Sequence, residues 1–79
     1  MKALKLVGVT VSEIDIDNTL EALQKEVEGY IERLTLVPQK VAMIVNEEGL
    51  LKGMTVNLSA STVAGVGILG PAVIVGIDG

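Results

Sequence analysis

The chain has 79 residues, a net charge of −4 and neither cysteine nor histidine. This length allows one domain over residues 1–79, and the missing side chains exclude disulfides and nearly all zinc and copper chemistry. Six scattered Lys and Arg residues among ten acids, with a single aromatic residue, also disfavour nucleic-acid binding, which needs clustered cations and stacking platforms.

The apolar residues make up 49% of the chain and are almost all aliphatic. Because the interior of such a short chain is small, some apolar surface is left uncovered. We therefore expect a homo-oligomer, with a tightly packed monomer as the alternative. Lys2 and Lys5 interrupt the first apolar stretch, which argues against a signal peptide and predicts a cytoplasmic location. Residues 54–77 carry no charge, but their glycines, proline and polar residues disfavour a membrane-spanning helix, and no membrane association is expected.

The first third of the chain predicts a strand and then a helix. Residues 1–11 alternate loosely and indicate a strand in which Gly8 marks a bulge or a turn. Residues 12–17 are interpreted as an acidic approach to the helix. Asn18 and Glu21 have the spacing of a capping box at the helix start. An apolar stripe follows at near-helical spacing: Leu20, Leu23, Val27 and Ile31.

Gly29 is the predicted end of this helix, and the rest of the chain predicts further strands. Strands are expected over residues 30–37, 41–45 and 72–77, with a short return strand over residues 50–52. The predicted fold class is therefore α+β, with one amphipathic helix packed on a small, mostly antiparallel β-sheet of four to five strands.

Residues 54–69 are small and hydroxyl-rich, and they are compatible with a loop, a short helix over residues 61–64 or an irregular strand pair. Gly65, Gly67 and Gly70 match the G-x-G-x-x-G spacing of dinucleotide sites, but a strand-like run follows where such a site needs a helix. A looser hypothesis is an anion site built from hydroxyl and backbone donors. The alternative is a connection whose glycines only permit turning.

The hypothesised ligand-binding residues include the lone aromatic residue, which offers a face for stacking or else completes the core. They are Tyr30, Arg33, Asn57, Ser59, Ser61, Thr62, Gly65 and Gly67. Glu47 and Glu48 are most simply solvated in a turn, and no histidine activates a Ser or Thr nucleophile. We therefore expect no catalytic residue, no metal site, no cofactor and no enzymatic activity.

Several runs together resemble an uncharacterised family of small proteins of Firmicutes, their phages and conjugative elements. The runs are Ile16-Asp17-Asn18-Thr19-Leu20-Glu21-Ala22-Leu23-Gln24, Gly29-Tyr30-Ile31-Glu32, Asn46-Glu47-Glu48-Gly49 with Lys52-Gly53, and Gly70-Pro71-Ala72-Val73-Ile74-Val75-Gly76. The chain departs from that family over residues 54–69, where members usually carry more charge. The resemblance implies a mobile-element protein made inside a bacterial host, and it supplies no established activity.

Two functions of different classes are open at this point. The first is an oligomeric module that sequesters a phosphate-bearing small molecule, such as a nucleotide signal of an immune system, and so acts against host defence. The second is an interaction module that inhibits or regulates a host or phage protein. It would use an exposed strand edge or an acidic helix face carrying Glu21, Glu28 and Glu32.

Overall fold

A computed structural model describes residues 1–37 and 39–76 of the chain, which form five strands and two helices in an α+β fold. The elements in chain order are β1 (Lys2–Val7), β2 (Thr10–Asp15), α1 (Leu20–Val27), β3 (Ile31–Leu36), β4 (Val41–Asn46), α2 (Leu58–Ala64) and β5 (Ala72–Gly76). The predicted fold class is confirmed, with one helix more than expected. Neither helix of the described residues has the length and apolar character needed to cross a membrane.

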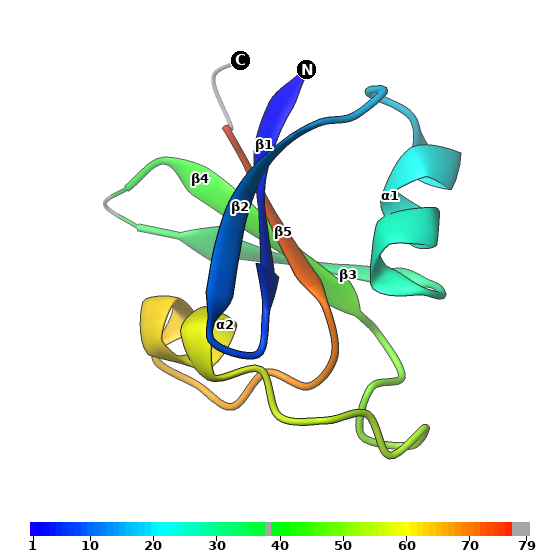
Figure 1. Ribbon diagram of the computed structural model, residues 1–79, viewed down its shortest axis with the longest axis vertical. Coiled ribbons are helices and arrows are strands. Elements are labelled where there is room, and N and C mark those ends of the chain that lie inside the picture. Colours follow the sequence, from blue (N-terminus) through cyan, green and yellow to red (C-terminus); the bar gives the residue numbers. More distant parts are fainter. Residues whose placement is uncertain (38, 77–79) are drawn as a thin grey trace.

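The five strands form one sheet in the order β2-β1-β5-β4-β3, and every neighbouring pair is antiparallel. The first and last strands of the chain are thus paired near the centre, while β2 and β3 form the two edges (Figure 1). Nothing among the described residues pairs with the outer side of β2 or of β3.

The sheet separates two hydrophobic clusters, each covered by one helix. Alternate residues of β4 point to opposite faces, so Ile44 joins the cluster under α1 and Met43 joins the cluster under α2. Val27 anchors α1 in the first cluster, and Ala60 anchors α2 in the second. Coverage on both faces explains why β4 is a continuous apolar run, as predicted (Figure 1).

The predicted first strand over residues 1–11 is instead a tight hairpin. Gly8 has a φ of 58° and starts a two-residue turn between the paired residues Val7 and Thr10, which fits a type II′ turn with glycine in its first central position. Residues 12–17, expected to be an acidic approach to the helix, lie mostly in β2. Most side chains of β2 are exposed, so this edge strand tolerates acidic residues and lacks the apolar pattern of a buried strand.

Helix α1 begins one residue later than the capping box predicted. The backbone N–H of Ile16 still pairs with the carbonyl of Met1, and the chain turns over the next residues, so Thr19 becomes the first residue able to cap. Its hydroxyl accepts a hydrogen bond from the backbone N–H of Ala22 at 3.1 Å. Asn18 is therefore not the N-cap.

The same helix ends earlier than Gly29, at Val27. Glu28 takes the left-handed conformation at the C-cap, and its N–H donates to the carbonyl of Gln24. Ile31, expected to be the last residue of the helical apolar stripe, instead begins β3.

The predicted strand over residues 50–52 is wrong. The N–H of Lys52 donates to the carbonyl of Glu48 at 2.9 Å, and the N–H of Gly53 donates to Leu50 at 3.1 Å, so this stretch forms consecutive turns. The last strand ends at Gly76, and the predicted final residue of that strand, Ile77, lies outside the described residues.

Two of the alternatives for residues 54–69 coexist. Helix α2 occupies the middle of the segment, from an N-cap at Asn57 to a left-handed C-cap at Gly65. Val56 and Leu69, on either side of the helix, form an isolated antiparallel bridge. Because the helix lies before Gly65 and a strand follows Gly70, the spacing of these glycines does not build a dinucleotide site.

Candidate interaction surface

Asn57 holds together three segments that are distant in sequence. Its side-chain N–H groups donate to the carbonyls of Leu6 at 2.7 Å and Gly70 at 2.8 Å. Its oxygen accepts from the N–H of Ala60 and the hydroxyl of Ser59, both at 3.0 Å. The side chain is almost fully buried, and these four bonds use both of its donors and both lone pairs. Asn57, predicted to bind a ligand, thus fixes α2 to β1 and to the approach of β5.

Two other hydroxyls of the predicted ligand site also have partners inside the protein. The Ser61 hydroxyl accepts from the N–H of Ile68 at 2.8 Å, and the Thr62 hydroxyl donates to the carbonyl of Leu58 at 2.9 Å. Gly65 ends the helix with a φ of 75° and donates its N–H to the carbonyl of Ser61. Residues 57–65 therefore have hydrogen-bonding roles that stabilise α2 and the loop after it.

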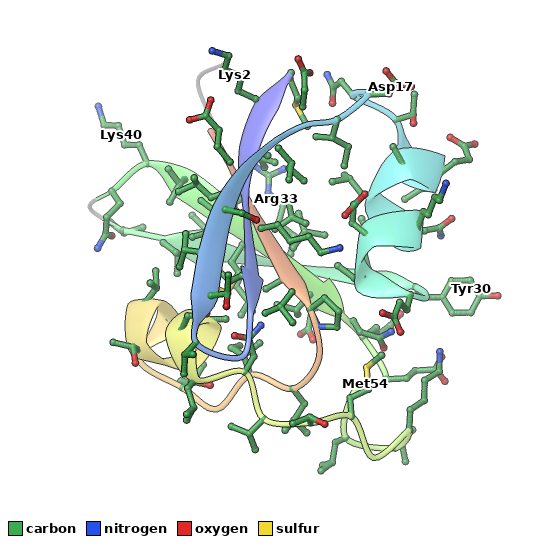
Figure 2. The ribbon with its side chains drawn as sticks, in the orientation of Figure 1. Lys2, Asp17, Tyr30, Arg33, Lys40 and Met54 are labelled. Atoms are coloured by element: carbon green, nitrogen blue, oxygen red, sulfur yellow. The ribbon has the colours of Figure 1, made fainter. Side chains whose placement is uncertain are left out.

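Two further predicted site residues, Tyr30 and Arg33, lie apart from this segment, while Gly67 lies in the loop directly after it. Tyr30 projects away from the body of the protein and lines a shallow pocket of about 180 Å³ with Gln24 and Lys52 (Figure 2). Arg33 is exposed on β3 and is paired with Ile44, which places it on the face of the sheet that α1 covers. Gly67 lines a separate cavity of about 280 Å³ beside Glu32. The fold does not gather the predicted ligand-binding residues at one place.

The fold does gather two segments that contain no charged residue. Residues 6–12 and residues 53–71 carry no Asp, Glu, Lys or Arg, so all sixteen charged side chains of the chain lie outside them. The Asn57 bonds join the two segments, and the N–H of Ser59 donates to the carbonyl of Gly8 at 2.7 Å. We call the surface formed by these two segments the uncharged end. In Figure 1 it is the region where the turn between β1 and β2 meets α2.

The uncharged end exposes many large aliphatic side chains. They are Val7, Val9, Val11, Val56, Leu58, Val63 and Val66, each at least 45% exposed. A cavity of about 480 Å³ opens between the two segments and is lined by Val7, Val56, Asn57 and Pro71, with Glu28 as its one charged lining residue. A surface with this many aliphatic groups and no charge resembles the central part of a protein interface, from which charged residues are depleted.

Some charged residues on the rest of the surface form ion pairs. Lys5 on β1 and Glu26 on α1 meet at 2.7 Å and are each about one-quarter exposed, which ties the helix to the sheet. Glu32, one of three residues predicted to share an acidic helix face, lies on β3, and Glu28 is the C-cap of α1. That acidic face is therefore not a single helical surface. The described residues contain no cluster of three or more carboxylates suited to holding a metal ion.

Sequence reasoning missed Val9, Val11 and Leu58 as candidate functional residues. The absence of charge from residues 54–77 was visible in the sequence, and residues 6–12 share it. What joins the two stretches is the amide of Asn57, fifty-one positions from Leu6 along the chain. A single-residue contact over that separation leaves no periodic signal in the sequence.

Comparison with curated proteins and with solved structures finds no match for this chain. A family model matches the whole of it, from residue 1 to residue 79. The chain therefore belongs to the family described as a domain of unknown function, DUF3846.

Proposed function

We propose that this chain is a protein-association module that acts by docking its uncharged end on another protein chain. One observation carries the proposal: the fold brings two charge-free segments together and leaves their aliphatic side chains exposed. Folding has removed other apolar side chains from water almost completely, including those of Leu6, Met43 and Val73. Other exposed apolar side chains, such as Leu50 and Leu51, lie next to a charged residue, Lys52, whereas those of the uncharged end share a surface whose two segments carry no charge.

The energetics of burial favour association through this surface. Each square ångström of apolar surface removed from water contributes about 25 cal/mol, and a well-buried Val or Leu side chain contributes about 1.5–3 kcal/mol. Burying a charged group without a partner offsets such gains by several kcal/mol. The uncharged end largely avoids that cost, because its two segments contain no charged residue and Glu28 is the one charged residue that lines the cavity between them.

The chemistry of the segment gives less support to capture of a phosphate-bearing molecule. Such a site needs free donors and nearby cations. The side chains of Asn57, Ser61 and Thr62 already bond within the protein, and residues 53–71 contain no Lys or Arg. Sequestration of a nucleotide signal stays a prediction, which calorimetric titration with cyclic nucleotides and ADP-ribose derivatives tests directly.

Site-specific photo-crosslinking tests the association surface in living cells. A benzoylphenylalanine at Leu58, on the uncharged end, should form covalent adducts with protein on irradiation. The matched control is the same group at Leu51, which is 86% exposed but lies in the turn after β4. The proposal predicts discrete protein adducts at position 58 that are at least about tenfold stronger than at position 51. Equal or absent adducts at the two positions would overturn it.

A further inference from the structure

The uncharged end contains part of an open sheet edge. Strand β2 is bonded on one side to β1, and its other side has no partner among the described residues. An unpaired edge strand presents free N–H and C=O groups that another strand can bind. Val11 in this edge is 54% exposed, and Val9 in the turn before it is 78% exposed.

The hairpin geometry shows which backbone groups point outward. In a two-residue hairpin the residues next to the turn, here Val7 and Thr10, form a hydrogen-bonded pair, and the bonding alternates along the strands. Val11 lies opposite Leu6 in a non-bonded pair, so its N–H and C=O face away from β1. The carbonyl of Leu6 accordingly points to the other side, where it accepts from Asn57.

Charge distinguishes this edge from the other one. The first half of β2, through Ser12, carries no charge, and Glu13 is the first ionised residue. Edge strand β3 has Glu32 and Arg33 next to each other near its start. Charged side chains on an edge strand oppose pairing with a second chain, so this protection covers the first half of β3 and the second half of β2. The uncharged half of β2, unlike that of β3, belongs to the uncharged end.

We propose that the partner of the uncharged end is a second copy of this chain, docked antiparallel along β2 with Val11 opposite Val11 of the copy. This inference rests on the proposed function and names its partner. In this register the N–H and C=O of each Val11 bond to those of the other, and Ser12 lies opposite Thr10 of the copy.

The distribution of charge along β2 selects this register. A shift that centres the pairing on Glu13 places two carboxylates directly opposite, which is destabilising. Centring on Ser12 leaves each Val11 opposite a Glu13. Centring on Ile14 sets each Glu13 opposite an Asp15, which again places like charges together. Centring on Val11 pairs two apolar residues and separates the two Glu13 carboxylates by four strand positions, which is about 14 Å.

The second helix of each copy adds to the same contact. Val11 is paired with Leu6, whose side chain belongs to the cluster under α2, so Val11 and α2 lie on one face of the sheet. A two-fold axis perpendicular to the sheet therefore places the α2 helices of both copies on that face, beside the two Val11 side chains. The dimer joins the sheets into one and covers uncharged surface with uncharged surface.

Disulfide trapping tests the dimer and its register, because the natural chain has no cysteine. In a hydrogen-bonded antiparallel pair the Cα atoms are about 5.5 Å apart, which suits a disulfide. Val11→Cys should therefore crosslink to its copy under mild oxidation. Two control variants carry the cysteine elsewhere. Glu13→Cys places the two thiols of the dimer too far apart to form a disulfide, and Leu51→Cys measures the rate at which exposed thiols crosslink by random collision. The proposal is supported if Val11→Cys crosslinks at least about tenfold faster than each of the two controls. Equal crosslinking rates in the three variants overturn it.

Sedimentation equilibrium supplies a measurement without crosslinking. The natural chain should sediment with twice the mass of one chain. Val11→Lys should weaken the dimer by at least about tenfold, because two ammonium groups would meet at the axis. Leu51→Lys makes the same change of charge on an exposed turn and should leave the dimer unchanged. A monomeric natural chain, or equal weakening by both variants, overturns the inference.

The photo-crosslinking result separates this inference from the proposed function on which it rests. Adducts at position 58 that consist of the chain crosslinked to itself support both. Adducts to a different protein, from a natural chain that sediments as a monomer, leave the proposed function standing and refute the self-association. The absence of adducts at position 58 refutes the proposed function itself.

Discussion

Asn57 shows how one buried amide can organise a small protein. It caps α2 with its oxygen and, with its nitrogen, holds the carbonyls of Leu6 and Gly70. The carbonyl of Leu6 lies near the end of β1 and that of Gly70 precedes β5, so the amide joins these two strands to α2 where they meet the helix. The residue thereby creates the surface whose exposed side chains, such as Leu58, are proposed to bind a partner.

Asn57→Ala should destabilise the fold by about 2–4 kcal/mol, because it removes the cap of α2 and leaves two buried carbonyls without donors. Asn57→Asp keeps the capping oxygen but turns another oxygen toward those carbonyls, so its loss should be at least as large. Ser59→Ala removes a single bond and should cost about 1 kcal/mol. Urea unfolding measures all three; an Asn57→Asp variant as stable as the natural chain would contradict the assigned role of the nitrogen.

At the C-terminal end of α1, the backbone conformation does not match the residue type that occupies it. Glu28 adopts a φ of 66° at the C-cap, a conformation that favours glycine, while Gly29 follows it with no such requirement. The sequence places its glycine one position after the C-cap, and therefore two positions after the last helical residue, Val27. This displacement explains why the predicted helix end was wrong by two residues.

Glu28→Gly should therefore stabilise the protein by about 0.5–1 kcal/mol, since glycine adopts the left-handed conformation without strain. Glu28→Gln removes the charge and keeps the strain, so it isolates the small effect of the helix dipole. Thermal unfolding at fixed protein concentration is the measurement. A gain from the glutamine variant equal to that from the glycine variant would assign the effect to charge rather than to backbone strain.

The ion pair of Lys5 with Glu26 links α1 to the sheet, with the two charged atoms 2.7 Å apart and both side chains only partly exposed. A double-mutant cycle with Lys5→Met and Glu26→Gln should give a coupling energy of about 0.5–1 kcal/mol, at the upper end for surface pairs because solvent reaches this one only in part. Repeating the cycle in high salt should lower the coupling. A coupling of zero would mean that α1 is held by its apolar contacts and by the hydrogen bond from the Asn46 amide to the carbonyl of Val27.

At the scale of the whole molecule, charged and uncharged residues occupy different regions. All charged side chains lie outside residues 6–12 and 53–71, and the chain carries a net charge of −4. A partner that covers the uncharged end leaves the charged surface in water, where it keeps the assembly soluble. The segregation thus divides the surface into the uncharged end, which we propose associates, and a charged part that would remain solvated.

The salt dependence of self-association follows from this separation. Because the contact buries no ion pair and two chains of charge −4 repel, added salt screens the repulsion and should leave the dimer equally strong or slightly stronger. Sedimentation at about 50 mM and about 500 mM NaCl measures the effect. A dimer that weakens tenfold in the higher salt would show that opposite charges hold it, contrary to the proposed contact.

Local patterns predicted part of this molecule well and part of it poorly. The buried strand β4, the last strand and the α+β class follow from apolar runs and from the spacing in α1, because burial imposes those patterns directly. The edge strand β2 is exposed on most positions and so carries no such pattern. Local patterns could not predict the uncharged end, because the hydrogen bond from Asn57 to Leu6 joins two segments that are distant in sequence.

Hydrogen exchange at the backbone amide of Val11 tests the association surface most directly. This N–H faces away from β1, so in a single chain it is open to water, whereas a docked copy would bond it. We expect exchange at Val11 to slow by at least about tenfold as protein concentration rises through the dimer range, while exchange at Leu51, in the exposed turn after β4, stays unchanged. An amide at Val11 that exchanges at the rate of an unstructured peptide at every concentration would contradict it.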